Sequence, residues 1–398
     1  FLSAKFSNPI LFSDVTIKKS STNNEGGGGG IAVYSSKIAL YQVNFNRCQA
    51  GKRGGGGLLL DEGSSAHLLD CIMNDNVATF DGSGGHVRVS GSSLIVHPKN
   101  SSMVWPISLP VFPALITMVT TFGTSLIQGL ASSSGGAVSC ISSFSKKVLV
   151  VYDREEEGIS SCQSTMYEYA MNNEVKYICA SKGVHLGTGS ILHTSTAVEG
   201  GGAIAAALCS IETSNSLIAN STSTRGNGGA FSLSLKSTLR VDNNSTFLNN
   251  TATVGSGGAI SCEDCNSIEL KQNTAFENNI AGLEGGALHL DTPTKKVTST
   301  RSLFIGNTAE LNGGAISSYR GELMSIGDRY EKNSALAGSG GAVSMTASHL
   351  HFDVTTICQN NSAINGGGGC VLWESEATTV HDKKWKTFQP NISNMQLI

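Results

Sequence analysis

Hydrophobic and polar positions along the chain follow one short pattern that returns eleven times. An apolar residue is followed three positions later by Asn or a small residue, and two positions after that by Ala or Thr. A Gly-Gly pair and a short apolar run complete the pattern, most clearly in FLNNTATVGSGGAI, FENNIAGLEGGAL, FIGNTAELNGGAI and YEKNSALAGSGGAV. After the glycines, alternation of period two, as in residues 231–235 (FSLSL), predicts short half-buried strands. No stretch has the 3.6-residue period of an amphipathic helix.

The spacing of the pattern is close to 28 residues in most copies. A fixed period of this length is typical of a solenoid in which each repeat is one structural unit. Gly, Asn, Ser and Thr fill the segments between the strands, which is turn chemistry. We therefore predict an all-β fold, a single-stranded parallel β-helix of about 11–12 coils with three short strands in each coil.

Each recurring position has an expected physical role. Asn side chains in one turn of every coil can hydrogen-bond along the solenoid, because neighbouring coils lie about 4.8 Å apart. Asn also tolerates the left-handed backbone of a sharp corner, Ala fits a cramped inward corner, and Gly-Gly permits positive φ at another corner. Replacing Asn279 or Asn307 by Leu is expected to lower stability rather than to change chemistry. The predicted ladder contains Asn76, Asn220, Asn250, Asn279, Asn307, Asn333 and Asn361. The predicted glycine corners are Gly257, Gly258, Gly285, Gly286, Gly313, Gly314, Gly340 and Gly341.

The pairing of FxxN with GGA[ILV], as in residues 276–279 (FENN) and 285–288 (GGAL), resembles the repeats of the chlamydial polymorphic membrane proteins. The resemblance spans about residues 11–375, apart from two insertions. It implies a right-handed β-helical surface domain that serves in adhesion or as a structural surface component. Related repeats also occur in large secreted proteins of protists and algae, so a bacterial passenger domain and a eukaryotic extracellular protein are both open.

We expect residues 1–398 to form one β-helical domain that is part of a longer chain, since neither end shows a polar capping unit. Longer gaps between repeats predict insertions at about 88–122 and 139–190. The first insertion includes the apolar residues 103–122, where three prolines argue against a membrane-spanning helix. We interpret this stretch as an apolar loop or subunit contact. The second insertion is the most charged segment, and we interpret it as a solvated loop held by cysteines. The alternative is partner recognition, for which this insertion is the expected place.

Composition restricts the partners. Charged residues make up 14% of the chain, the net charge is −3, and Lys and Arg form no stripe. These values give no electrostatic basis for binding nucleic acid or an anionic membrane. We predict an extracellular or cell-surface location, no transmembrane span, and partners that are copies of the chain, other subunits of a surface assembly, a glycan, or a host or cell-surface ligand.

Ten cysteines without zinc-type spacing indicate an oxidising compartment. The pair Cys262 and Cys265 is a C-x-x-C without a second pair, so we expect a local disulfide or turn cysteines rather than a metal site. Cys358 and Cys370 fall in one coil and are candidates to bridge its turn. The candidate disulfide cysteines are Cys140, Cys162, Cys179, Cys262, Cys265, Cys358 and Cys370. We predict no metal ion and no cofactor.

Seven Asn residues begin the glycosylation sequon N-x-S/T, at positions 100, 220, 243, 244, 249, 360 and 391. Asn100, in an insertion, and Asn391, beyond the last coil, are the candidate N-glycosylation sites if the source is eukaryotic. Asn220 occupies a predicted ladder position and is expected to be buried and unmodified.

Parallel β-helices also serve as polysaccharide lyases and glycosidases, and glycosidases need two carboxylates about 5–9.5 Å apart. Glu263, Asp264 and Asp291 offer only a loose cluster, with Arg320 on the next coil. We interpret His349 and His351 as surface residues. The sequence therefore predicts a non-catalytic surface protein with a structural, fibre-forming or adhesive role. The alternative is a carbohydrate-binding or carbohydrate-degrading β-helix of the pectin lyase type.

Overall fold

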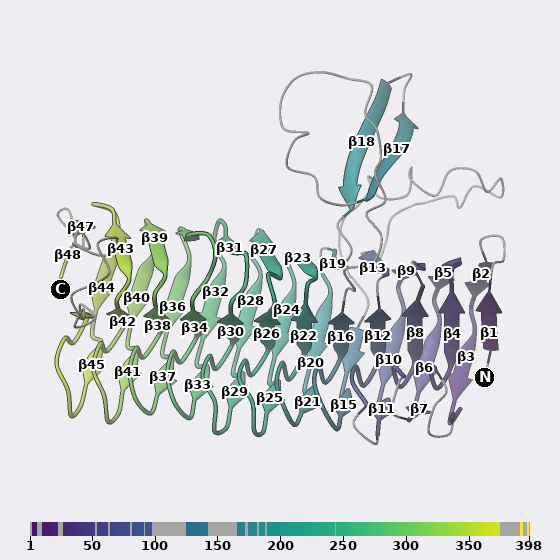
Figure 1. The fold of residues 1–398 in the computed structure, drawn as a ribbon, viewed down its shortest axis with the longest axis horizontal. Coiled ribbons are helices and arrows are strands. Elements are labelled where there is room, and N and C mark those ends of the chain that lie inside the picture. The colour runs from purple at the N-terminus through teal and green to yellow at the C-terminus, as the bar shows by residue number, and fades with distance from the viewer. Residues whose placement is uncertain are drawn as a thin grey trace, which may run out of the picture.

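Four parallel β-sheets run along the chain in the computed structural model (Figure 1). It describes residues 2–97, 125–141, 165–180, 183–374, 391–392 and 396–397, apart from short gaps at 6–9, 23–26, 52–53, 63, 80–81, 91, 172–173, 188 and 243. In every sheet, strands from successive repeats are hydrogen-bonded neighbours in the order of the sequence. This order is that of a parallel β-solenoid, which confirms the predicted fold class; the right-handed winding stays a prediction.

Two of the sheets contain the strands that follow the glycine pairs. Sheet A contains β1 (Leu2–Lys5), β4 (Ile31–Tyr34), β8 (Leu58–Asp61), β12 (Val87–Ser90), β16 (Val138–Ile141), β22 (Ile204–Ala207), β26 (Phe231–Ser234), β30 (Ile260–Glu263), β34 (Leu288–Asp291), β38 (Ile316–Tyr319), β42 (Val343–Thr346) and β46 (Val371–Glu374). Sheet B contains β2 (Ile10–Ser13), β5 (Lys37–Tyr41), β9 (Ser65–Leu69), β13 (Ser93–His97), β19 (Gly183–Leu186), β23 (Ser210–Ser214), β27 (Thr238–Asp242), β31 (Ser267–Leu270), β35 (Val297–Thr300), β39 (Glu322–Ile326), β43 (His349–Phe352) and β47 (Asn391–Ile392).

The other two sheets contain the strands on either side of the Asn position. Sheet C contains β3 (Thr16–Lys18), β6 (Asn44–Asn46), β10 (Ile72–Asn74), β14 (Ser125–Ile127), β20 (Ile191–His193), β24 (Leu217–Ala219), β28 (Thr246–Leu248), β32 (Ala275–Glu277), β36 (Leu303–Ile305), β40 (Arg329–Glu331), β44 (Ile357–Gln359) and β48 (Gln396–Leu397). Sheet D contains β7 (Gln49–Ala50), β11 (Val77–Ala78), β15 (Leu130–Ala131), β21 (Thr196–Ala197), β25 (Thr222–Ser223), β29 (Thr251–Ala252), β33 (Ile280–Ala281), β37 (Thr308–Ala309), β41 (Ser334–Ala335) and β45 (Ser362–Ala363). Outside the solenoid sheets, β17 (Thr165–Met171) and β18 (Glu174–Ala180) pair in antiparallel fashion.

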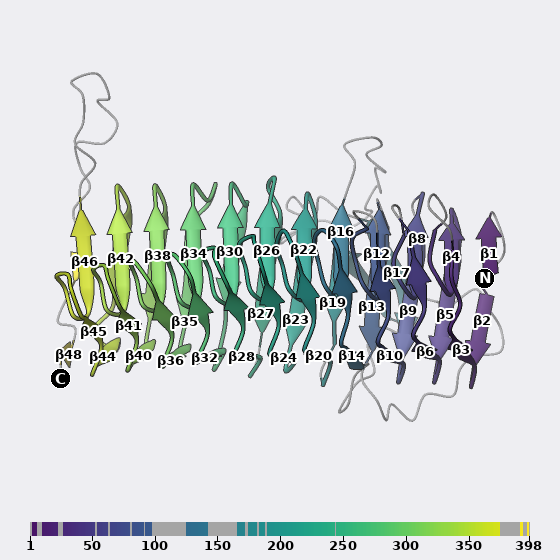
Figure 2. The same cartoon turned by 90° about the horizontal axis from the view of Figure 1, so that it is seen from below.

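One coil consists of four strands, in the order C, D, A and B, as in β28, β29, β30 and β31 (Figures 1 and 2). The sequence predicted three strands, and the missed fourth is the two-residue strand of sheet D, which is too short to show alternation. Ten successive coils contribute to all four sheets, and additional strands extend sheets A, B and C to twelve. The predicted number of coils, about 11–12, is close to this arrangement.

The predicted bounds of the insertions are too wide where the structure describes them. Residues 87–90 and 93–97 are strands of sheets A and B, so the solenoid continues beyond position 88. The strands at 138–141 and 183–186 likewise extend the solenoid into the second expected insertion. The apolar residues 103–122 lie outside the described residues, as do the charged residues 153–157. Within the described part of the chain, no helix is long and apolar enough to span a membrane.

The interior of the solenoid contains an aromatic column with one ring from each of four successive strands of sheet C. Ring centroids of Phe247, Phe276, Phe304 and Tyr330 follow one another at 4.9–5.0 Å with nearly parallel planes. Phe231, from sheet A, meets the column edge-on at 5.1 Å. All these side chains are fully buried, and each ring pair adds about 0.5–1.5 kcal/mol beyond the burial of its area. The apolar position of the repeat therefore stabilises contacts between coils.

Candidate functional site

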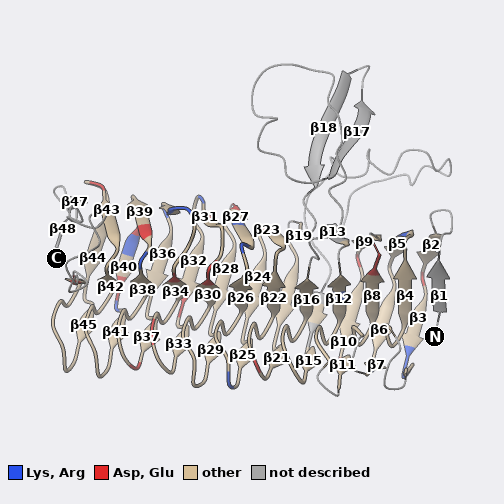
Figure 3. Ribbon diagram, viewed as in Figure 1, with Lys and Arg blue, Asp and Glu red and all other residues tan. Residues whose placement is uncertain are grey.

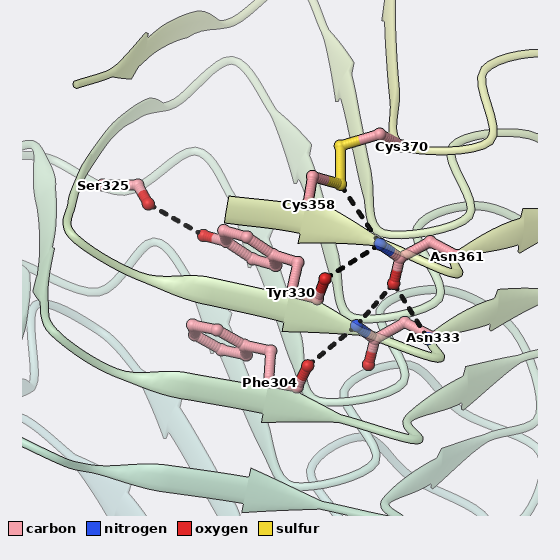
Figure 4. Close-up of a disulfide and its surroundings, with 7 residues drawn as sticks. All are labelled: Phe304, Ser325, Tyr330, Asn333, Cys358, Asn361 and Cys370. Carbon is pink, nitrogen blue, oxygen red and sulfur yellow. Dashed lines mark hydrogen bonds between the residues drawn. A yellow bond between two sulfur atoms is a disulfide. The ribbon is translucent and has the colours of Figure 1, made fainter. Parts of the chain in front are cut away.

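The asparagine ladder runs through the corner between sheets C and D. The Oδ1 atom of Asn307 accepts hydrogen bonds from the backbone N–H and the side-chain Nδ2 of Asn279, at 3.0 and 2.9 Å. Its own Nδ2 donates to the carbonyl of Phe276 at 2.9 Å and to Oδ1 of Asn333 at 3.0 Å. Asn333 and Asn361 repeat the arrangement one coil further on (Figure 4). Each ladder amide thus has hydrogen-bond partners for its own oxygen and nitrogen, and it also supplies a partner to a backbone group of the neighbouring coil.

Two further predicted ladder residues lie in this corner. Asn250 is linked to Asn279 in the same way, with Asn279 Oδ1 accepting from the backbone N–H and from Nδ2 of Asn250, both at 3.0 Å. Asn76 lies in an equivalent position, where its Oδ1 accepts from the backbone N–H of Cys48 at 2.8 Å. The ladder is continuous from 250 to 361, and Asn76 is a separate member near the other end of the described solenoid.

Asn220 is not in the ladder, and its predicted burial is wrong. The strand pairing sets Ile218 opposite Phe247, so the buried apolar residue is Ile218 and the ladder position is Ser221, whose N–H donates to Asn250 Oδ1 at 3.0 Å. Asn220 is exposed and has a φ of 53°. The segment LIANST offers two adjacent apolar residues, and the sequence pattern alone did not distinguish the two registers.

The two glycines of each pair serve different purposes. The first glycine has a left-handed backbone, with φ of 71° at Gly257, 65° at Gly285, 68° at Gly313 and 70° at Gly340. The second lies against the next coil: a Cβ atom on Gly286 would be 2.1 Å from the carbonyl oxygen of residue 314. Gly258, Gly314 and Gly341 have the same close approach. Backbone conformation therefore requires the first glycine, and the spacing between coils requires the second.

Three disulfides join cysteines of the described solenoid. Cys262 pairs with Cys265, and Cys358 pairs with Cys370 across the turn of one coil (Figure 4). Cys140 pairs with Cys209, a partner that sequence reasoning missed because it lies in the turn between sheets A and B of the following coil.

The side chains of the remaining predicted glycosylation and disulfide residues lie outside the described part of the structure. Cys162 and Asn100 lie outside the described residues. Cys179 belongs to β18 and Asn391 to β47, and the surroundings of both side chains are outside the description.

The outer face of sheet A brings together the acidic residues considered for catalysis. Glu263 and Asp291 are direct partners in neighbouring strands, and Glu263 accepts a hydrogen bond from the amide of Asn227. Asp264, the residue that follows β30, instead forms an ion pair with Lys236. The guanidinium carbon of Arg320 lies 5.0 Å from the ring centroid of Tyr319. The two carboxylates that could act together are therefore Glu263 and Asp291.

Beside this pair, Glu284 is held by hydrogen bonds. Its two carboxylate oxygens accept from Asn312 Nδ2 at 2.9 Å and from Ser317 Oγ at 3.0 Å. His289 Nδ1 lies 3.9 Å from Glu284 Oε2, and the imidazole is only 14% exposed. Burial lowers the pKa of His289, although Glu284, Asp291 and Glu263 act in the opposite direction. The imidazole of His289 is accordingly neutral at neutral pH. Glu284 is held in place as the hydrogen-bond acceptor of Asn312 and Ser317.

The two histidines considered as surface residues, His349 and His351, are half-buried in β43. Among the described residues, no group of three or more His, Cys, Asp or Glu side chains is placed to hold a metal ion. Charged residues are sparse over the described chain and form no continuous stripe of one sign (Figure 3).

A buried carboxylate at the corner between sheets B and C escaped the sequence analysis. Asp328 is fully buried, and its carboxylate accepts hydrogen bonds from Ser302 N at 2.7 Å and Ser325 Oγ at 2.6 Å. Tyr330 donates its hydroxyl to Ser325 Oγ at 3.1 Å (Figure 4). Burial raises the pKa of Asp328 to about 6, although these hydrogen bonds act to lower it. The signal was an Asp at a position that is Ser302 in the preceding coil and Thr356 in the next.

Two segments of the chain match the Chlamydia polymorphic membrane protein (Chlamydia_PMP) repeat, at residues 244–263 and 301–319. Each match covers the C, D and A strands of one coil, from the aromatic position through Gly-Gly to the following strand. Comparison with curated proteins and with solved structures gave no match. The chain therefore carries repeats of this type on a parallel β-solenoid, as the FxxN and GGA[ILV] motifs predicted.

Proposed function

We propose that this repeat protein is a non-catalytic component of a cell surface, where the solenoid acts as a stiff rod with a structural or adhesive role. The repeat that it carries is characteristic of polymorphic membrane proteins, a family of surface-associated proteins. The location of the chain outside the cell and its role there are the proposal.

The observation that carries the proposal is the continuous ladder from Asn250 to Asn361 beside the aromatic column. Both join each coil to the next through buried contacts, so bending the solenoid at any of these coils would break hydrogen bonds and separate stacked rings. Ten coils at about 4.8 Å each give a rod about 48 Å long. The inward side chains serve this rigidity, and charged residues make up only 14% of the chain.

The disulfides support an oxidising location. Disulfides persist in extracellular proteins and are rare in reducing compartments. The Cys140–Cys209 disulfide joins β16 to the turn between β22 and β23 of the next coil. The Cys358–Cys370 disulfide joins β44 to the residue before β46.

The first experiment tests location. Intact cells are treated with a membrane-impermeant amine reagent, and the protein is then isolated and examined for modified exposed lysines such as Lys236 and Lys332. Modification on intact cells is expected. Modification only after lysis would overturn the proposal.

Electron microscopy of the native protein, isolated without denaturant, then tests the mechanical role. Ordered fibres or rods joined end to end are the outcome expected for a structural assembly, and single rods that bind cells are expected for an adhesin. Rods that neither assemble nor bind cells would contradict both roles.

A second candidate function is hydrolysis or binding of a carbohydrate, and the register of Glu263 with Asp291 favours it. Neighbouring parallel strands lie about 4.8 Å apart, which is close to the carboxylate separation that retaining glycosidases use, about 5–5.5 Å. A screen against polysaccharides would use Glu263→Gln and Asp291→Asn, with Asp61→Asn as the matched control. Asp61 ends β8 at the same position of sheet A and has Tyr34 as its partner in the preceding strand. A hydrolytic activity lost in the first two variants and kept in the control would establish this candidate and refute the non-catalytic proposal.

A further inference from the structure

The corner between sheets C and D contains two adjacent asparagine positions with opposite environments. The ladder position is buried, as at Asn250. The position just before it has a left-handed backbone and an exposed side chain: φ is 53° at Asn220, 53° at Asn249 and 55° at Asn360. We call Asn220, Asn249 and Asn360 the corner asparagines. They occupy the same place in three coils, in the turns that follow β24, β28 and β44 (Figure 1).

In this chain the N-x-S/T sequon falls on only one of the two positions in these coils. Two residues after a corner asparagine comes the first residue of the D strand, which faces outward and is Thr222, Thr251 or Ser362. Two residues after a ladder asparagine comes the second residue of that strand, which faces inward. In all six coils with a ladder Asn, this residue is Ala: Ala78, Ala252, Ala281, Ala309, Ala335 and Ala363. The ladder asparagines therefore lack the hydroxyl that a sequon needs, whereas all three corner asparagines have it.

We propose that the corner asparagines Asn220, Asn249 and Asn360 carry N-linked glycans, which form a row of carbohydrate along one corner of the rod. In this transfer the amide nitrogen attacks the anomeric carbon of a lipid-diphosphate-linked oligosaccharide. The new N–C bond forms as the C–O bond to the diphosphate breaks, and the amide proton leaves with the released lipid diphosphate. The inference rests on the extracellular location in the proposed function, because the transfer takes place on chains that enter a secretory pathway.

The folded corner has room for these groups. Asn249 and Asn360 are exposed. Asn220 Nδ2 lies 2.8 Å from His193 Nε2 of the adjacent coil, and a glycosylated amide keeps one N–H with which to make this bond. Asn244, exposed with a φ of 54° at the corner between sheets B and C, also begins a sequon and meets the same conditions.

Spacing predicts unequal occupancy. Asn220 and Asn249 lie on adjacent coils, about 4.8 Å apart along the rod. Two branched glycans at this separation would collide, so we expect most chains to carry one glycan at this pair. Asn360 lies four coils beyond Asn249, or about 19 Å, and is expected to be occupied independently.

The test uses the native protein purified from its source. Peptide N-glycosidase releases the glycan and converts the modified Asn to Asp, and peptides are then sequenced by mass spectrometry after the reaction in heavy-oxygen water. Labelled Asp is expected at the corner asparagines and at none of the ladder asparagines. A native chain with no labelled Asp at 220, 249 or 360 would overturn the inference. Surface labelling of intact cells is independent of carbohydrate: a labelled but unglycosylated chain refutes this inference alone, whereas an unlabelled chain refutes the proposed location.

Variants secreted from a eukaryotic host separate the sequon from the fold. Asn249→Gln and Thr251→Val each destroy one sequon, and the solenoid accepts both residues at these places, since Gln128 has a φ of 56° at the equivalent corner and Val77 begins the equivalent D strand. Both variants should lose the glycan at position 249 and secrete normally.

A gain-of-site variant provides the converse test. Asn278 has the same exposed, left-handed corner, with a φ of 52°, but is followed two residues later by Ile280, which is 49% exposed. Ile280→Thr completes a sequon, and Thr occupies the same position at 251 and 308. In the Asn249→Gln background, which removes the adjacent glycan, this variant should gain a glycan at Asn278. Failure to gain it, with Asn360 still occupied, would contradict the argument that this corner accepts a glycan wherever the hydroxyl is present.

Discussion

Replacing Asn307 by Ala should remove the hydrogen bonds that join two coils of the ladder without disturbing the backbone. The variant keeps the backbone N–H of residue 307, which donates to Asn333 Oδ1 at 3.0 Å. It loses the amide that accepts from the N–H of Asn279 and donates to the carbonyl of Phe276. Ala occurs naturally in neighbouring interior positions, so steric strain is not expected.

The cost follows from the backbone N–H that is left without an acceptor. Asn279 is fully buried, and an unsatisfied buried group costs about 1–3 kcal/mol. The carbonyl of Phe276 loses the Asn307 amide as a donor, but it lies in β32, which stays paired with β36. The side chain of Asn279 loses one partner but retains the carbonyl of Phe247 at 3.0 Å. We therefore expect the free energy of unfolding to fall by about 1–4 kcal/mol, for one unsatisfied donor and the lost side-chain bonds.

Urea unfolding of the variant measures this cost, and hydrogen exchange locates it. The backbone amide of Asn279 should exchange faster, because its acceptor has been removed. The amide of Asn333, whose acceptor is Asn361 at 2.9 Å, serves as an internal reference. Thr308→Ala is the matched control, since residue 308 is the adjacent outward position of β37, and its expected effect is within about 0.5 kcal/mol.

Two results would refute the reasoning about the ladder. One is a loss of stability in Asn307→Ala no larger than that in the Thr308→Ala control. The other is unchanged exchange at the amide of Asn279, which would mean that water or a shift of the coil satisfies it.

The remaining predictions concern pH and the disulfides. Asp328 has a pKa of about 6 in the folded protein, above the unfolded value of about 3.9, so its stabilising contribution is complete below about pH 4 and is lost as pH rises through 6. Asp328→Asn should remove a pH dependence of about 3 kcal/mol between pH 4 and 8, seen as the difference between urea unfolding curves of variant and wild type; parallel curves would contradict it. Removing Cys140–Cys209, which closes a separation of 69 residues, should cost about 4 kcal/mol, and removing Cys262–Cys265, with a separation of 3, about 1.5 kcal/mol. Double Cys→Ala variants compared by thermal unfolding check this order, and equal losses would argue against the loop-closure explanation.

The repeat pattern was sufficient to predict the parallel solenoid and most of the ladder, because the same spacing of apolar, Asn, Ala and Gly-Gly positions recurs in many coils. Position 307, for example, is fixed by the aromatic residue before it, the Ala after it and the glycine pair beyond, and neighbouring coils repeat all three. Asn220 shows where this evidence fails. Its segment contains two adjacent apolar residues, and only the pairing of Ile218 with Phe247 decides which of them faces inward.

Features that occur once could not be predicted in this way. The pairing of Cys140 with Cys209 depends on how a turn of one coil lies over the preceding coil, and that geometry is absent from the spacing of the cysteines. The pKa of Asp328 depends on burial at a corner where neighbouring coils place hydroxyl groups. Glu263 and Asp291 were recognised as a loose cluster, but their direct pairing follows only from the register of β30 and β34.

The corner between sheets C and D explains why structural and surface roles can coexist in one short motif. A left-handed backbone at the corner position costs a non-glycine residue roughly 1–2 kcal/mol, yet Lys332, Gln128 and Thr194 all adopt it there, with φ of 54–56°. Lys332 is followed by the ladder residue Asn333, whose buried hydrogen bonds offset the cost of the left-handed backbone. Gln128 and Thr194 lack this support, because the ladder positions after them are Gly and Ser. In the sequence, these two coils follow the two longest intervals between repeats, so the coils next to the interruptions lack a ladder Asn. The left-handed backbone does not require a particular side chain at the corner position. That position can therefore carry exposed residues with a function at the surface of the rod.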